Sequence, residues 1–120
     1  MREVKADLIL SSPARRALAT AKIIAKGIDY KRGNIVIDHR LYPGAAATLL
    51  KIIHRLDKRV DRVMMVGHDP ALTELARRLS KSITHMPTCA VAEFTFETKS
   101  WPKADKSTLA TVRLERPKKS

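Results

Sequence analysis

The chain of 120 residues is 44% hydrophobic and carries 24 lysine and arginine side chains against 12 aspartates and glutamates, a formal net charge of +12. This composition excludes a disordered or low-complexity segment, and the length suits one domain with one core. Its apolar runs are too short to cross a membrane, and residues 1–5 do not start a signal-peptide core, so we expect neither a span nor a leader. The one cysteine, Cys89, cannot form an internal disulfide, and we expect a cytoplasmic protein.

The excess of positive charge would suit nucleic acid, an anionic lipid surface or a phosphorylated partner. The basic residues are spread along the whole chain, however, and one tryptophan, two tyrosines and two phenylalanines offer few rings for stacking on bases. Nucleic-acid binding therefore stays an alternative that charge alone supports.

The first predicted unit is a strand followed directly by a helix. Residues 7–11 (Asp-Leu-Ile-Leu-Ser) predict the strand, and Ser12-Pro13 predicts a helix start with a serine cap and a proline at the first helical position. We expect Gly27 to close this helix. Arg16 lies in its first turn, at a junction where a phosphate would dock. The predicted buried stripe consists of Ala17, Leu18, Ala21, Ile24 and Ala25.

The second unit predicts a short strand over residues 35–37 and a helix over residues 45–56. Its two histidines are weak candidates for a site. His39 lies in the connecting loop beside Arg40. His54 is expected on the outer face of the helix among several cations, so we predict a solvated side chain. The residues predicted to point inward are Leu49, Ile52, Ile53 and Leu56.

The third unit holds the strongest functional signal. The apolar run 63–66 predicts a strand buried on both faces, and Gly67 permits a tight turn. Asp69-Pro70 then predicts an N-cap followed by a first-position proline. His68 would lie between the carboxyl end of a strand and the amino end of a helix, where α/β sheets bind ligands and free N–H groups attract anions. The helix repeats its apolar face at Leu72, Leu75, Ala76 and Leu79.

The carboxyl-terminal part predicts two more strands, residues 91–98 and 108–114, joined by a loop with Trp101 and Pro102. The order β-α-β-α-β-α-β-β is typical of an α/β fold with a largely parallel sheet, covered on both faces, and an antiparallel finish. Residues 1–115 show no domain boundary and are expected to form a single domain, and residues 116–120 a mobile basic tail.

Four segments resemble, in order and spacing, the motifs of a known family. Residues 11–17 (Ser-Ser-Pro-Ala-Arg-Arg-Ala) with Thr20-Ala21 resemble the second core motif of the histidine phosphatase superfamily, and residues 66–70 (Val-Gly-His-Asp-Pro) resemble its later histidine motif. Leu41-Tyr42 and residues 86–91 resemble the corresponding segments of the small bacterial phosphohistidine phosphatases of the SixA type. The resemblance extends from residue 7 to about residue 101 and implies the phosphoglycerate mutase-like fold, with three layers in the order α/β/α.

The resemblance implies phosphoryl transfer through a histidine, without a cofactor or a metal. In the family, an arginine after the Ser-Pro strand grips the phosphate and a second histidine contacts the phosphoryl oxygens; these positions are Arg16 and His68 here. Positive charge fixed around the equatorial oxygens stabilises the transition state. The implied partner is a phosphohistidine protein or a small phosphorylated substrate. A phosphohistidine has a labile P–N bond and needs no strong acid at the leaving group.

The chain departs from the family at its beginning. The family's nucleophilic histidine follows an earlier strand, in an Arg-His motif, whereas residue 1 here stands just before the Ser-Pro strand. His39, His54 and His85 do not follow a strand in that way. We therefore expect a truncated domain that is inactive as given, or a non-catalytic paralogue that binds phosphorylated protein through Arg16 and His68. Because the family's first strand lies inside its sheet, we also expect self-association through exposed sheet edges, or marginal stability.

Two other kinds of phosphate chemistry find no support in the sequence. Cys89 lacks the arginine six residues later that a cysteine phosphatase loop needs, since residue 95 is a threonine, and we predict a small buried side chain. The four glycines form no nucleotide-binding P-loop. His85 is interpreted as an ordinary loop histidine.

Overall fold

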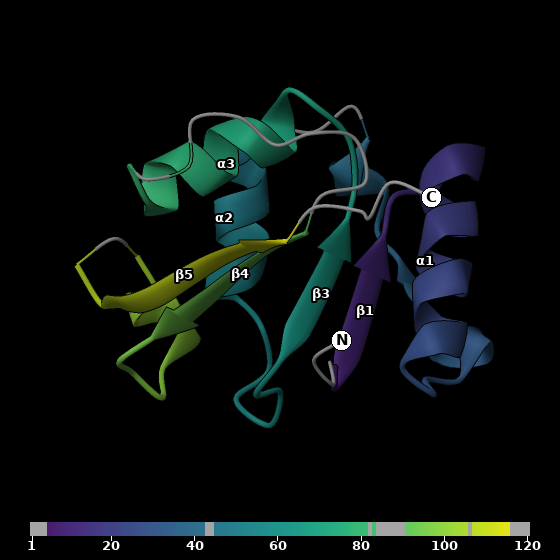
Figure 1. Ribbon diagram of the computed structural model, residues 1–120, viewed down its shortest axis with the longest axis horizontal. Coiled ribbons are helices and arrows are strands. Elements are labelled where there is room, and N and C mark those ends of the chain that lie inside the picture. Colours follow the sequence, from purple (N-terminus) through teal and green to yellow (C-terminus); the bar gives the residue numbers. More distant parts are fainter. Residues whose placement is uncertain (1–4, 43–44, 82, 84–90, 106, 116–120) are drawn as a thin grey trace.

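A three-stranded parallel sheet forms the centre of the computed structural model, which describes residues 5–42, 45–81, 83, 91–105 and 107–115 (Figure 1). Strand β1 (Leu8–Ser11) lies between β2 (Val36–Ile37) and β3 (Val63–Val66). In register, Ser11 stands beside Ile37 on one side and Val66 on the other. The three apolar runs therefore form the strands predicted for them, with their carboxyl ends at one edge.

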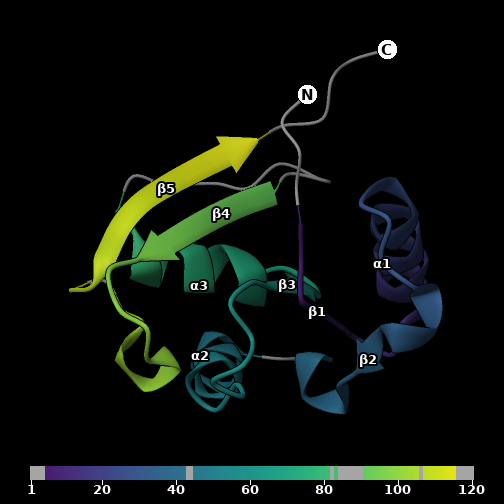
Figure 2. The same ribbon diagram turned by 90° about the horizontal axis from the view of Figure 1, so that it is seen from below.

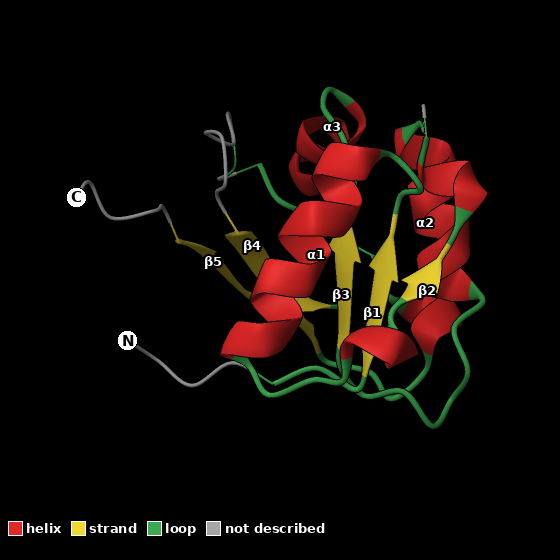
Figure 3. Ribbon diagram, turned by 90° about the vertical axis from the view of Figure 1, so that its right-hand side faces the viewer, coloured by secondary structure: helices red, strands yellow, loops and turns green. Residues whose placement is uncertain are grey.

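Helices cover both faces of this sheet. Helix α1 (Arg15–Gly27) packs its small side chains against one face (Figure 3), and α2 (Ala46–His54) and α3 (Ala71–Leu79) pack on the other. Because successive residues of a strand point to opposite faces, Ile9 belongs to the core under α1 while Leu10 belongs to the core under α2 and α3. The predicted three-layer α/β/α arrangement is confirmed.

The antiparallel part forms a sheet of its own. Strands β4 (Val91–Phe96) and β5 (Leu109–Glu115) pair with each other, and within the described residues neither pairs with the parallel sheet. Phe94 and Phe96 pack against the core shared by α2 and α3, so the hairpin lies alongside these helices and away from α1 (Figure 2). We predicted an antiparallel finish to one continuous sheet; the structure has side-chain packing, in place of backbone pairing, between the two parts.

The helix ends differ from the prediction by one or two residues. Helix α1 begins at Arg15 with Ala14 as its N-cap, so Pro13 stands outside the helix. At its other end the chain reverses at Asp29, which has a φ of 60°, and Gly27 remains in the helix. Helix α3 begins at Ala71, and Pro70 is its N-cap. Proline is a good marker for the start of a helix, but its fixed φ is also compatible with the positions just before the first helical residue.

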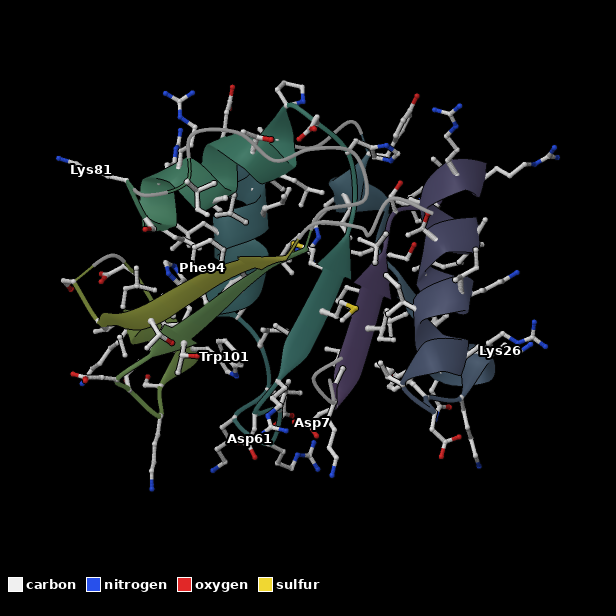
Figure 4. All side chains as sticks on the ribbon, viewed as in Figure 1. Asp7, Lys26, Asp61, Lys81, Phe94 and Trp101 are labelled. Carbon is white, nitrogen blue, oxygen red and sulfur yellow. The ribbon has the colours of Figure 1, made fainter. Side chains whose placement is uncertain are left out.

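His54 is not a solvated histidine, and that prediction is wrong. Its Nε2 lies 2.9 Å from the carbonyl oxygen of Ala104, which is 1% exposed. The short 3₁₀ helix η3 (Trp101–Lys103) packs on α2, and the indole Nε1 of Trp101 donates to the carbonyl of Val60 at 2.7 Å (Figure 4). A distant loop therefore partly covers His54, whereas Lys51 and Arg55 on the same side of α2 remain exposed.

At the amino end of the parallel sheet, a carboxylate links the starts of β1 and β3. Asp7 accepts hydrogen bonds from the backbone N–H groups of Asp61 and Arg62 at 3.0 and 2.9 Å, and Figure 4 shows Asp7 and Asp61 together at this end. These bonds fix the start of β3 beside the start of β1. The two strands then run in parallel, so the residues that follow them meet at the opposite edge.

Candidate functional site

The residues that follow β1 and β3 are in direct contact at the carboxyl edge of the sheet. The backbone N–H of Ser12 donates to the carbonyl of Val66 at 2.9 Å, which continues the strand pairing by one residue. Pro13 and Gly67 come next along the chain and lead from the sheet toward α1 and α3, respectively. His68 therefore stands beside the turn that leads into α1.

Ser12 holds His68 by its side chain. The Ser12 Oγ lies 2.7 Å from Nε2 of His68 and also accepts the backbone N–H of Ala14 at 3.1 Å. Ser12 is fully buried and His68 is partly buried. From the sequence, Ser12 is predicted only as a helix cap, because a contact across 56 positions depends on β1 and β3 being neighbours in register.

Tyr42 supports the same imidazole from a third segment. The ring centroids of Tyr42 and His68 are 4.9 Å apart with an angle of 73° between the planes, an edge-to-face contact. Tyr42 follows the 3₁₀ helix η2 (His39–Leu41) and is 57% exposed. From the sequence, Tyr42 is recognised only as part of the Leu41-Tyr42 motif. His68 is thus held by residues from the ends of β1 and of the β2 loop.

Arg16 lies at the start of α1, as its second residue, and is exposed. It follows Ser12 by four residues, so the two Cα atoms are at most about 14 Å apart. Its side chain forms no hydrogen bond or ion pair with any described residue, and the same holds for Arg15. The chain therefore brings an unpaired guanidinium to the edge that carries His68. Contact of Arg16 and His68 with one phosphoryl group stays a prediction.

The amino end of α1 is electrostatically unusual. Its N-cap, Ala14, makes no side-chain capping bond, and its first turn holds no acidic residue but two arginines. A helix amino end carries partial positive charge and unsatisfied N–H groups. Two further cations there are unfavourable unless an anion binds beside them.

The amino end of α3 is different from what we predicted. The Asp69 carboxylate accepts the backbone N–H of Thr73 at 3.3 Å and the hydroxyl of the same residue at 2.7 Å. The N–H of Leu72 donates to the carbonyl of His68 at 3.1 Å. Because these groups already have partners, the start of α3 is not the free anion site that the motif suggested. Within the described residues, the backbone N–H groups of Arg15, Arg16 and Ala17 at the start of α1 have no acceptor.

The fold matches a solved structure. A structure described as that of a candidate phosphohistidine phosphatase, SixA, from Nakamurella multipartitia superimposes with a TM-score of 0.69, over 90% of this chain and 70% of that chain, at 18% sequence identity. The chain has a SixA-like histidine phosphatase fold. No family model matches this sequence, and a search of curated proteins finds no significant match.

The third strand of this histidine phosphatase fold also ends at the site edge, but its cation is neutralised. Asp38, directly after β2, accepts two hydrogen bonds from the guanidinium of Arg40, at 3.0 and 2.6 Å. Hydrogen bonding by Arg40 lowers the pKa of the Asp38 carboxyl below its usual value. His39 is exposed in η2. Arg40 is therefore less available to an external anion than Arg16.

Within the described ranges, no three His, Cys, Asp or Glu side chains come together in a group that could hold a metal ion. The same residues contain no helix long and apolar enough to span a membrane. The predictions for His85, for Cys89 and for the basic tail 116–120 lie outside the described residues, as does most of the motif at 86–91.

Proposed function

We propose that this chain is a phosphohistidine phosphatase-like domain that binds a phosphoryl group at the carboxyl edge of its parallel sheet. The observation that carries the proposal is the 2.7 Å hydrogen bond between Ser12 and His68, which fixes an imidazole next to the uncapped, cationic start of α1. The likeness in fold to a candidate phosphohistidine phosphatase supports the same reaction class.

In this proposal the two site residues have separate roles. Arg16 offers a planar guanidinium that can donate two parallel hydrogen bonds to phosphoryl oxygens. His68 donates one hydrogen bond and, when protonated, adds positive charge. Because the transferred group spreads its negative charge over the equatorial oxygens, donors held in place before the reaction stabilise the transition state. The main-chain N–H groups at the start of α1 would add to this stabilisation.

The proposed partner is a protein phosphorylated on histidine, or a small phosphorylated molecule. The open, exposed position of Arg16 and Tyr42 suits a phosphoryl group presented by another protein. We propose the cytoplasm as the place where this partner is met, because a protein with one cysteine is expected in a reducing compartment.

Covalent transfer also needs a nucleophile, and neither His68 nor His54 is suited to it. Nε2 of His68 faces Ser12, and Nε2 of His54 faces a backbone carbonyl at the distant η3 turn. We therefore propose that these 120 residues bind a phosphoryl group but release no phosphate from phosphohistidine. Phosphate release by this chain would mean that another residue, such as His39, attacks phosphorus.

We also propose that the chain self-associates through its sheet edges. Within the described residues, β3 pairs with β1 alone and β4 pairs with β5 alone, so each has an edge without a backbone partner. Unpaired edges are sites for strand addition. Light scattering coupled to gel filtration should give a mass above one chain that rises with concentration; one chain's mass at all concentrations would contradict this.

Titration with inorganic phosphate, followed by calorimetry and by amide NMR, tests the binding proposal. His68→Ala and Arg16→Ala should each weaken binding by about tenfold or more, because each removes hydrogen bonds to a charged group. Lys26→Ala is the matched control for charge, since Lys26 lies in the last turn of the same helix (Figure 4). His54→Ala is the control for loss of a histidine. Equal affinities in all four variants would refute the assignment.

A further inference from the structure

The hydroxyl of Ser12 has a defined hydrogen-bonding direction. A hydroxyl has one proton to donate and two lone pairs that accept. The Ser12 Oγ accepts the N–H of Ala14, and Ser12 is fully buried, so water cannot take its proton. Among the described residues, Nε2 of His68 is the acceptor within reach, at 2.7 Å. Since a buried hydroxyl without an acceptor is unfavourable, Ser12 donates to Nε2 when the imidazole is neutral.

This direction determines where the imidazole proton lies. If Nε2 accepts, the proton of the neutral ring must be on Nδ1. When the ring is protonated on both nitrogens, Nε2–H donates to the Ser12 Oγ, which has a second lone pair, and Nδ1 keeps its proton. Nδ1 forms no hydrogen bond to any described residue. His68 therefore keeps an N–H donor without a partner among the described residues in both charge states.

We propose that Ser12 is a positioning residue that holds His68 as the Nδ1–H tautomer, so that Nδ1 is the nitrogen that donates to a phosphoryl oxygen. The edge-to-face contact with Tyr42 limits rotation of the same ring. The role toward the phosphoryl oxygen rests on the proposed function, whereas the tautomer does not. Without Ser12, the neutral ring is free to adopt the Nε2–H form that histidine favours in water. Nδ1 would then present a lone pair to the anion.

Two-bond proton–nitrogen correlation spectra of the ¹⁵N-labelled chain distinguish the two tautomers directly. At about pH 8.5, above the range in which histidines ordinarily titrate, the His68 signal should show the Nδ1–H pattern. The signal is identified by its absence from His68→Gln. An Nε2–H pattern in the unaltered chain would overturn the proposal, and no variant is needed for this outcome.

Ser12→Ala tests the cause, and Ser11→Ala is its matched control. Ser11 is equally buried, but its hydroxyl donates to the carbonyl of Ser12 at 2.9 Å and forms no hydrogen bond with the imidazole. Ser12→Ala should shift His68 toward Nε2–H, and Ser11→Ala should leave the Nδ1–H pattern. Amide spectra report whether each variant is folded. An unchanged tautomer in folded Ser12→Ala would show that Ser12 is not the positioning residue.

Inorganic phosphate added at the same pH separates this inference from the proposed function. We expect the His68 Nδ1 and its proton to shift on titration, and the phosphate Kd to rise about tenfold in Ser12→Ala while staying within about twofold in Ser11→Ala. Phosphate binding to a ring with the Nε2–H pattern would refute the tautomer and leave the proposed function standing. The Nδ1–H pattern without any response to phosphate would refute the proposed function and the role of Nδ1 in it.

Discussion

The two junctions between strand and helix at the carboxyl edge of the sheet differ in charge. After β1, helix α1 starts with Arg15 and Arg16, with no acid in its first turn and no side-chain cap. After β3, helix α3 starts behind Asp69, whose carboxylate accepts two hydrogen bonds from Thr73. Because negative charge stabilises a helix amino end, the second junction is stabilised by its own residues and the first is not.

This difference indicates where an external anion would bind. The junction after β3 supplies the imidazole of His68, but its helix start is already occupied by a carboxylate that would repel a phosphoryl group. The junction after β1 supplies two arginines that form no ion pair with any described residue, and its Ser12 holds the imidazole on that side. We infer that the phosphoryl group lies at the start of α1, with His68 contributed across the sheet edge.

Reversal of charge at the first junction should have the largest effect. Arg16→Glu removes a bidentate donor and places a carboxylate next to the anion, so we expect phosphate affinity to fall about a hundredfold. Calorimetry with inorganic phosphate at constant ionic strength measures this. Lys26→Glu makes the same change at the other end of α1 and should alter the affinity by less than about twofold. Similar losses in both variants would mean that net charge, and no defined site, attracts phosphate.

Removal of the carboxylate at the second junction should affect stability instead. Asp69→Ala deletes the carboxylate that accepts two hydrogen bonds from Thr73 at the start of α3, and we expect the free energy of unfolding to fall by about 1 kcal/mol. Phosphate affinity should stay the same or rise slightly, because a repulsive charge is lost. Urea denaturation and the phosphate titration measure the two quantities. A large loss of phosphate binding in the folded variant would show that the anion lies at α3 and would invert the comparison.

The same Arg16→Glu variant should be slightly more stable than the unaltered chain. A glutamate in the first turn interacts favourably with the helix dipole, whereas the arginine it replaces does not, so we expect a gain of about 0.3–1 kcal/mol in the free energy of unfolding. Arg16→Gln should fall between the two. A loss of stability on removing this arginine would indicate a structural role for Arg16, and the functional interpretation of the first junction would weaken.

Sequence patterns predicted most of the elements because these depend on local periodicity. The runs 8–11 and 63–66 became neighbouring strands, and the apolar repeat through Leu75 and Leu79 became the buried face of α3. The same kind of reasoning placed Arg16 and His68 at one edge of the sheet, since parallel strands end together. Neither result required knowledge of contacts between distant residues.

The parts that could not be predicted depend on such distant contacts. Ser12 meets His68 across 56 positions, and His54 meets Ala104 across 50. The pattern around His54 correctly identified a face without large apolar residues, but it could not show that η3 would pack beside His54. In the same way, alternation predicted β4 and β5 but could not show that they would form a separate sheet.

We expect the smallest effect at the end of β2. A change there tests the comparison of charge between the strand ends. Here the carboxylate of Asp38 neutralises the guanidinium of Arg40. The negative charge comes from the chain itself, as the charge of Asp69 does at α3. Hydrogen bonding by Arg40 also lowers the pKa of Asp38. A lowered pKa means that the ionised carboxylate stabilises the fold at neutral pH, and that this contribution is lost as the pH falls from about 3.9, the ordinary value, through the lower value in the folded state.

Asp38→Asn keeps an acceptor for the backbone N–H of Arg40 but removes the charge. We therefore expect the variant to be less stable than the unaltered chain at pH 7, with the difference shrinking in acid below about pH 4. Denaturation curves at several pH values measure this difference. The change also releases a guanidinium at the site edge, so phosphate affinity should rise slightly in Asp38→Asn. No rise would mean that the end of β2 lies too far from the anion to matter, and that the site is limited to the junctions after β1 and β3.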